Sequence, residues 1–506
     1  MVRRATILAV ALAGALSLVA PAAGGAAEPP DLPGGLDGPA TRPSDDEPSL
    51  PSGLGGDDGG PALPEGLGGD EPGLPAGLDE TAGATRDEAR AARDKTVIEA
   101  LNDAGFRGFL EGRGGLRTQN DPHQDDASLA EARFQAQWLG STETLRMKVT
   151  GDILYDDLAD DRDDIDLRRG RGGVDLREAW AGFSPLDWMD VKVGRQILTW
   201  GTGDLLFVND LFPKDWQAFF LGRDVDYLKA PSDAVRISAF SDPINADLVY
   251  VPLMNPSRFI SGRRLSYYNP TLGRLAGRDA IIDDDLPSEW FEDGEVATRL
   301  YRRVGSYELA AYGFWGFYKT PDGFDPAGNV AVYPGLNTYG ASLRGPLGRG
   351  IGNVEAAYYD SEDDRDGTDP RTPNSQVRLL VGYEVDLPRI ARDLTVGGQY
   401  YVEIMMDHDA YLDSRPAGAP AADEDRHVIT VRLTKLLWNQ TLEVSFFAYY
   451  SPTDDDAYLR PALAYDIDDY WSVHLAANVF LGEDVHTFFG QLQDNSNVYG
   501  ALRYAF

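Results

Sequence analysis

The last ten residues of the chain alternate between two kinds of side chain. Val498, Leu502, Tyr504 and Phe506 share one face, and Arg503 lies on the other. A period of two predicts a β-strand, and its apolar and aromatic face needs an apolar neighbour. The segment therefore predicts a strand with one apolar side, as found in a membrane β-barrel or as the final strand of a soluble β-sandwich.

The same alternation recurs from residue 106 to the C-terminus. It gives about 18 strands, with 16 as the nearest alternative. We expect them to begin near Phe106, Leu129, Glu143, Val174, Trp188, Ala234, Asp247, Glu295, Tyr307, Asn337, Asn353, Gln376, Asp393, His427, Thr441, Tyr458, Tyr470 and Asn497.

The connections between these strands alternate between short and long. Short ones are expected at 140–142, 184–187, 242–245, 303–306, 345–350, 387–392, 438–440 and 466–469. Short turns at one rim and long loops at the other are typical of bacterial transmembrane barrels, and a soluble sandwich has no reason to follow this pattern. The predicted fold is all-β, a transmembrane antiparallel β-barrel over residues 106–506, with both ends of the barrel on the periplasmic side.

Charged residues are confined to one face of each predicted strand. Because an arginine at the bilayer midplane costs about 2–4 kcal/mol, the uncharged face must be the lipid face. A barrel of this size leaves an aqueous channel. Charges facing each other across it would produce a transverse field, whereas charges paired between neighbouring strands would strengthen the wall; the sequence allows both. The inward candidates are Arg299, Arg344, Arg378, Arg432, Arg460, Arg503, Glu384, Glu403 and Glu443.

Two long connections are unusual in composition. Residues 199–229 are rich in aromatic side chains, so this segment either folds inward as a constriction or packs on the rim. Residues 253–293 contain Arg258, Arg263 and Arg264 and, further along, Arg274 and Arg278. These arginines form an anion-attracting mouth or constriction, or they pair with acidic loops or lipopolysaccharide phosphates. The first alternative predicts a weak anion preference in the pore.

The N-terminal part has a different character. Residues 1–27 are predicted to be a secretory signal peptide, because two arginines precede an apolar run. Residues 28–84 are rich in Gly, Pro and acidic residues and are predicted to be a disordered periplasmic tract. Four Leu-Pro-x-Gly-Leu units within it, starting at Leu32, Leu50, Leu63 and Leu74, are either parts of a spacer or docking motifs repeated for avidity. A short periplasmic helix is predicted over residues 85–105.

Charge and composition exclude several classes of function. The net charge of −36 argues against binding nucleic acid, and the acidic runs fall in connections expected to face lipopolysaccharide. With no cysteine and only five histidines, the chain shows no zinc spacing, phosphate loop or dinucleotide motif. We therefore predict no enzyme activity, no catalytic residue, no cofactor and no metal site.

Two stretches resemble known families. The end of the chain, with Tyr504 and Phe506, resembles the C-terminal signature of bacterial outer-membrane barrels, which implies recognition by the barrel-assembly machinery. Val-Gly-Arg-Gln at 193–196, Trp-Gly at 200–201 and Asn-Asp-Leu-Phe-Pro at 209–213 resemble a proteobacterial porin-like family of unknown function, distantly similar to alginate-export-type barrels. Some members of that family are associated with inner-membrane exporters, which implies a lipid or hydrophobic cargo.

The expected function is an outer-membrane, porin-like channel that passes small solutes through a charge-lined lumen. The alternative is the outer-membrane component of a lipid or hydrophobic-cargo export system that docks a periplasmic partner through its N-terminal repeats. Outer-membrane lipid and lipopolysaccharide are expected neighbours, and association into a homo-oligomer is left open. The solute itself does not follow from the sequence.

Overall fold

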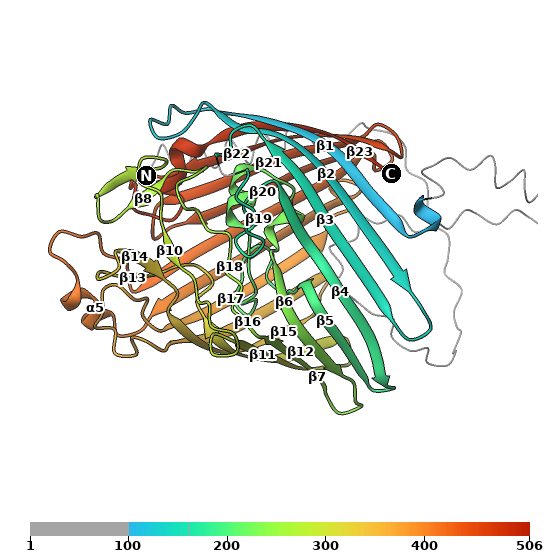
Figure 1. Ribbon diagram of the computed structural model, residues 1–506, viewed down its shortest axis with the longest axis horizontal. Helices are drawn as coiled ribbons and strands as arrows, with labels where there is room; N and C mark the ends of the chain where they lie inside the picture. Colours follow the sequence, from blue (N-terminus) through green and yellow to red (C-terminus); the bar gives the residue numbers. More distant parts are fainter. Residues whose placement is uncertain (1–100, 161) are drawn as a thin grey trace, which may run out of the picture. The chain divides into compact units, whose positions relative to one another are not determined.

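The computed structural model describes residues 101–160 and 162–506. Within these residues, 18 strands form one antiparallel sheet whose first and last strands pair, so the sheet closes into a barrel (Figure 1). This confirms the predicted count and decides against 16. The barrel strands are β1 (Phe106–Arg117), β2 (Ala127–Ser141), β3 (Arg146–Asp156), β4 (Val174–Leu186), β5 (Met189–Ile197), β6 (Pro231–Ala239), β7 (Asn245–Val251), β11 (Glu295–Val304), β12 (Tyr307–Phe317), β15 (Gly335–Leu347), β16 (Gly350–Ser361), β17 (Gln376–Asp386), β18 (Leu394–Met405), β19 (Asp425–Leu437), β20 (Leu442–Ser451), β21 (Asp456–Asp466), β22 (Trp471–Leu481) and β23 (Asn497–Ala505).

The barrel closes between β1 and β23, whose register runs from Phe109 opposite Ala505 to Arg117 opposite Asn497. Beyond the ladder, the backbone N–H of Gly108 donates to the carbonyl of Phe506 at 2.9 Å, and the reverse bond has the same length. Closure pairs the edge strands, which a barrel in lipid requires because no water is there to hydrogen-bond an open edge.

Short turns lie at one end of the barrel and long connections at the other (Figure 1). β4 ends at Leu186 and β5 begins at Met189, and β11 ends at Val304 with β12 beginning at Tyr307. The long connections contain the remaining elements: α4 (Trp216–Leu221), η1 (Val225–Leu228), β8 (Tyr267–Asn269), β9 (Arg274–Ala276), β10 (Asp284–Asp285), β13 (Gly323–Asp325), β14 (Val330–Val332), α5 (His408–Ser414) and η2 (Gly490–Asn495). The predicted alternation of short and long connections is confirmed.

Side chains alternate between the two faces of the wall. On β23, Val498 is 49% exposed and Leu502 is 47% exposed, whereas Tyr499 and Ala501 are buried. On β18, Tyr400 is exposed and its neighbour Tyr401 is buried. The exposed face is a belt of large apolar side chains, which suits contact with hydrocarbon. None of the helices in the described ranges has the length and hydropathy needed to cross a membrane.

Several N-terminal predictions fall outside the described residues. These are the signal peptide at 1–27 and the tract at 28–84, with the repeats that start at Leu32, Leu50, Leu63 and Leu74. Of the helix predicted over 85–105, the structure describes only the end: residues 101–103 are helical and Gly105 has a φ of +83°. A left-handed glycine at this point is a common helix stop.

Candidate channel constriction

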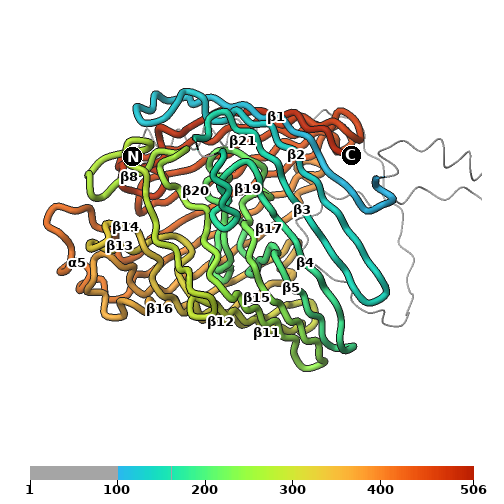
Figure 2. Tube along the Cα trace, in the orientation of Figure 1, coloured from blue at the N-terminus to red at the C-terminus, as the bar shows by residue number. Residues whose placement is uncertain are grey.

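Residues 198–230, which connect β5 to β6, fold into the interior of the barrel. Figure 2 shows this green segment within the ring of strands. Phe219 and Phe220 of α4 are buried against Tyr458 of β21, with ring centroids 5.9 Å and 5.4 Å away. Phe220 also lies 5.7 Å from the ring of Phe480 on β22. Of the two alternatives for this aromatic segment, the inward fold is therefore correct.

The first limb of this loop is held by Glu355 of β16, which is almost fully buried. The carboxylate accepts hydrogen bonds of 2.8 Å from the hydroxyl of Thr202, the backbone N–H of Gly203 and the side-chain amide of Asn209. A buried carboxylate is costly unless hydrogen-bonded, and here neutral donors from the loop supply the partners. Glu355 thus fixes both ends of residues 202–209.

The tip of the first limb reaches the strands that follow Glu355 around the barrel. Arg432 of β19 pairs with Asp204, with Nη2 to Oδ1 at 2.7 Å. The backbone N–H of Asp204 donates to Gln399 of β18 at 2.7 Å. Tyr449 of β20 donates to the carbonyl of Leu205 at 2.8 Å. The limb is thereby attached to three further strands.

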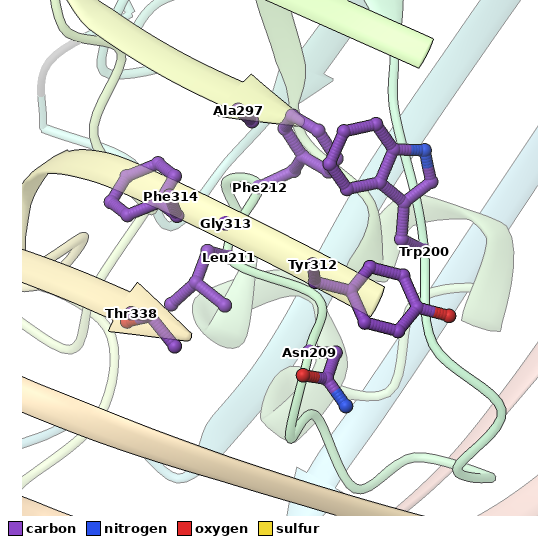
Figure 3. Close-up of a pocket in the computed structure, with 9 residues that line it drawn as sticks. All are labelled: Trp200, Asn209, Leu211, Phe212, Ala297, Tyr312, Gly313, Phe314 and Thr338. Carbon is purple, nitrogen blue, oxygen red and sulfur yellow. The ribbon is translucent and has the colours of Figure 1, made fainter. Parts of the chain in front are cut away.

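An aromatic contact seals the loop against β12. The ring of Trp200 lies 4.9 Å from that of Phe212 in an edge-to-face arrangement and 6.2 Å from that of Tyr312 (Figure 3). The space left between these rings, Phe314 and Thr338 is about 10 Å³. Because one water needs about 10–15 Å³, the rings leave room for no more than about one water between them.

The return limb is attached to a different part of the wall. Arg223 pairs with Glu131 of β2 at 2.6 Å, and Tyr227 donates to Asp152 of β3 at 2.7 Å. Asp224 pairs with Arg503 of β23 at 3.0 Å. Burial acts to raise the pKa of Asp224, but Arg503 and Arg113 hold this pKa below its ordinary value.

The two limbs together cross the barrel interior, with attachments to β16, β18, β19 and β20 on one side and to β23, β2 and β3 on the other. Every attachment named above joins the loop to an inward-facing side chain of the wall. A loop held at both sides by charged and hydrogen-bonded contacts reduces the free interior of the barrel to the space beside it. The arrangement is a constriction within a wide barrel.

The residues that carry the porin-like resemblance are the ones that position this loop. Gly194 has a φ of +122°, and a Cβ there would lie 2.3 Å from the carbonyl oxygen of Ala179. Arg195 pairs with Asp233 at 2.8 Å, which ties β5 to β6 at the base of the loop. Asp210 accepts a 2.6 Å hydrogen bond from Thr199 across the loop's own base.

Several predicted lumen residues pair within the wall. Arg299 of β11 pairs with Glu308 of β12 at 2.6 Å. Arg378 of β17 pairs with Glu403 of β18 at 3.1 Å. Arg503 also pairs with Glu111 of β1 at 2.7 Å. Pairing between neighbouring strands, one of the two alternatives, is therefore present at these positions.

The remaining candidates on the strands occupy varied surroundings. Arg460 lies with its guanidinium carbon 4.3 Å from the ring centroid of Phe219, so it packs on the loop. Arg344 stands opposite Glu308 in the register of β15 and β12 and is exposed. Glu384 and Glu443 are partly exposed. Tyr504 contacts Trp471 with centroids 4.9 Å apart, and the ring of Phe506 stacks on Phe134 of β2 at 6.1 Å.

The arginine-rich connection 252–294 is largely held by acids. Arg258 is buried and pairs with Asp175 at 2.7 Å and Asp215 at 3.1 Å. Arg264 is buried and pairs with Asp156. Burial lowers the pKa of Arg264 to about 10, although nearby Glu131 acts to raise it.

The two other flanking arginines are also paired. Arg274 pairs with Asp279 at 2.8 Å, and Arg278 pairs with Asp125 at 2.9 Å. Pairing with carboxylates, one of the two alternatives for this cluster, is therefore present at Arg258, Arg264, Arg274 and Arg278. Arg263 differs: among the described residues its side chain has no ion pair, and its Nε is buried without a hydrogen-bond partner.

The sequence did not single out the wall residues that hold the loop. The alternation predicts that Glu131 and Glu355 face inward, together with several other acids, but does not distinguish them, and nothing in the sequence marks Asp204 or Arg223. An inward carboxylate on a strand and a loop rich in Asn, Thr and Gly are the sequence features that could have suggested such a contact. The residues that pair across the barrel are up to 228 positions apart, however, so the sequence does not show which of them meet. The described part of the chain has no group of three His, Asp or Glu side chains arranged to bind a metal ion.

Comparisons with known proteins add similarities of structure alone. No protein-family model and no curated protein matches the sequence. Similar solved structures include OccAB3 of Acinetobacter baumannii, with 11% identity, a TM-score of 0.47, and coverage of 79% of this chain and 98% of that one. OccAB1 of the same organism has 8% identity and a TM-score of 0.47, over 80% and 96% of the two chains. A triple mutant of the Rhodopseudomonas blastica porin has 10% identity and a TM-score of 0.34, over 79% and 99%.

Proposed function

We propose that the protein is an outer-membrane channel for small solutes, in which the loop 198–230 forms a fixed constriction. The observation that carries the proposal is the attachment of this loop to charged side chains on both sides of a closed barrel. A barrel of 18 strands is too wide for its inward side chains to fill. The loop supplies the narrowing that makes a channel of such width selective.

The charges at the constriction support passage of hydrated solutes. The first limb of the loop is surrounded by charged groups. Its Asp204 pairs with Arg432 of the wall, and Glu384 of the wall is close enough to interact with Asp204 electrostatically. Charged groups held by ion pairs present oriented dipoles and partial charges to the lumen without collapsing onto one another. Charged side chains at the narrow part of a wide pore contribute to its ion selectivity.

The structure suggests a clean test of the channel. Ile197 and Pro231 are directly paired in the register of β5 and β6, so residues 199–229 can be replaced by a short Gly-Ser turn. In planar lipid bilayers the full protein should show stepwise conductance, and the shortened variant should conduct severalfold more. A barrel that is silent across the voltage range would contradict the proposal.

A matched control shortens another loop. Residues 409–421 lie in the long connection that contains α5, which has no buried residue. Replacing them by a Gly-Ser turn should leave the conductance close to that of the full protein. An equal increase in both variants would mean that the loop 198–230 does not form the narrowing.

The export alternative has no support from the described residues, because its docking repeats lie outside them. It stays a prediction, and deletion of residues 28–84 tests it.

A further inference from the structure

A small cavity lies where three of the long connections meet, at the outer end of β3. It is lined by residues from 157–173, from the constriction loop and from 252–294, and its volume is about 80 Å³. By the same measure one water needs about 10–15 Å³, so the cavity has room for a small ligand with water.

The acids that line this cavity are fully engaged. Asp156 pairs with Arg264, and Asp215 pairs with Arg258 at 3.1 Å and also accepts the backbone N–H of Ala218 at 2.7 Å. No lining carboxylate among the described residues is therefore free to bind a cation.

Most of the lining arginines are engaged as well. Arg223 pairs with Glu131, and Arg169 pairs with Asp284 at 2.9 Å. Arg171 lies 3.7 Å from the same Asp284. Arg162 stacks on the ring of Tyr155, 5.1 Å from its centroid.

Three lining side chains keep unused donors. Arg263, Ser261 and Gln217 all line the cavity, and none of these side chains makes a hydrogen bond within the described residues. Their hydrogen-bonding groups are a guanidinium, a hydroxyl and an amide, which all donate. A site with free hydrogen-bond donors, a positive charge and no free carboxylate is complementary to an anion that accepts hydrogen bonds.

We infer that this cavity binds a small oxyanion, a carboxylate or a phosphate group, through Arg263, Ser261 and Gln217. Guanidinium groups bind both anions through paired N–H···O hydrogen bonds. Burial and the cations Arg117 and Arg278 act to lower the pKa of Arg264 beside the site, and a bound anion would offset this crowding of positive charge. The inference rests on the proposed function, because it places a recognition site for anionic solutes beside the constriction loop.

The test measures binding by the full-length protein in detergent micelles, where no conduction is needed. Isothermal titration at constant ionic strength uses inorganic phosphate in one arm and acetate in the other. We expect one site per chain for at least one of them. Arg263→Gln should weaken binding by about tenfold or more through loss of a charge-assisted hydrogen bond, and Ser261→Ala by a smaller factor.

Arg274→Gln is the matched control, since Arg274 lies in the same connection, is exposed and pairs with Asp279. It should leave affinity unchanged. Heat-dependent mobility on gels verifies that each variant forms the barrel. No binding of either anion, or equal binding by Arg263→Gln and the unaltered protein, would overturn the inference. If the protein conducts but binds neither anion, the anion site is excluded and the channel proposal stands. If the protein binds an anion but does not conduct, the channel proposal is excluded and the anion site stands.

Discussion

Arg432 of β19 donates a 2.7 Å hydrogen bond to Asp204 of the constriction loop, although the two residues are 228 positions apart in the sequence. With the contacts of Glu355, this ion pair holds the first limb against the wall opposite its point of entry. The position of the first limb therefore depends on contacts with strands far along the chain from the loop itself.

Glu355→Gln should loosen the constriction. Glutamine keeps only one acceptor oxygen. Either the Asn209 amide, which donates to Oε2, or the Thr202 and Gly203 donors, which donate to Oε1, therefore lose their partner. We expect larger and noisier single-channel conductance in planar bilayers. Glu308→Gln, which breaks an ion pair between β11 and β12, serves as the control and should leave the noise unchanged.

Arg258→Ala should destabilise the folded barrel by about 3–5 kcal/mol, because it leaves the buried Asp175 and Asp215 without their cation. A Cβ at position 170 would collide with this guanidinium, so the glycine there leaves the room that Arg258 occupies. Urea unfolding in micelles measures the change. Arg365→Ala, which removes an exposed pair with Asp360, should unfold at nearly the urea concentration of the unaltered protein.

Arg263→Gln should shift ion selectivity toward cations. Of the arginines at 258, 263 and 264, Arg263 is the one without an ion pair in the described chain, so its charge is the least compensated. The measurement is the reversal potential in a salt gradient, at low ionic strength where screening is weak. An unchanged reversal potential would place this connection outside the conduction path.

Phe506→Ala should slow closure of the barrel. The terminal residue exchanges two backbone hydrogen bonds with Gly108, and its ring stacks on Phe134, so the last side chain helps to set the register of the closing strands. The folded fraction during refolding into lipid vesicles reports the effect. Phe506→Tyr keeps the ring and should refold at nearly the original rate; equal slowing by both changes would exclude the ring contact as the cause.

Deletion of residues 28–84 should leave single-channel conductance unchanged, because the barrel strands begin at Phe106. A spacer role predicts that cells carrying the deletion also keep their normal export. Loss of export with intact conductance would favour docking through the Leu-Pro-x-Gly-Leu units.

The sequence by itself determined the barrel. Side chains on a strand alternate between two faces, and charged side chains are disfavoured on the face that contacts lipid. The sequence of each strand therefore predicts which of its faces points outward. Tyr307 and Asn497, for example, were expected to begin strands and do so. The alternation of short and long connections likewise predicted that strands that follow each other in the sequence run in opposite directions, with the short turns at one rim.

Only the tertiary structure decided what the long connections do. Residues 199–229 were compatible with an inward loop or a rim contact. Their aromatic composition predicts that they are buried, but it does not identify the surface against which they pack. The partners of Asp204, Arg223 and Arg258 lie on distant strands or loops, and pairing at such separations has no periodic signal in the chain. Ion pairs depend on which side chains the closed barrel brings within reach. Within the part of the chain that the structure describes, they distinguish Arg264, whose charge Asp156 compensates, from Arg263 one residue before it, which has no ion pair.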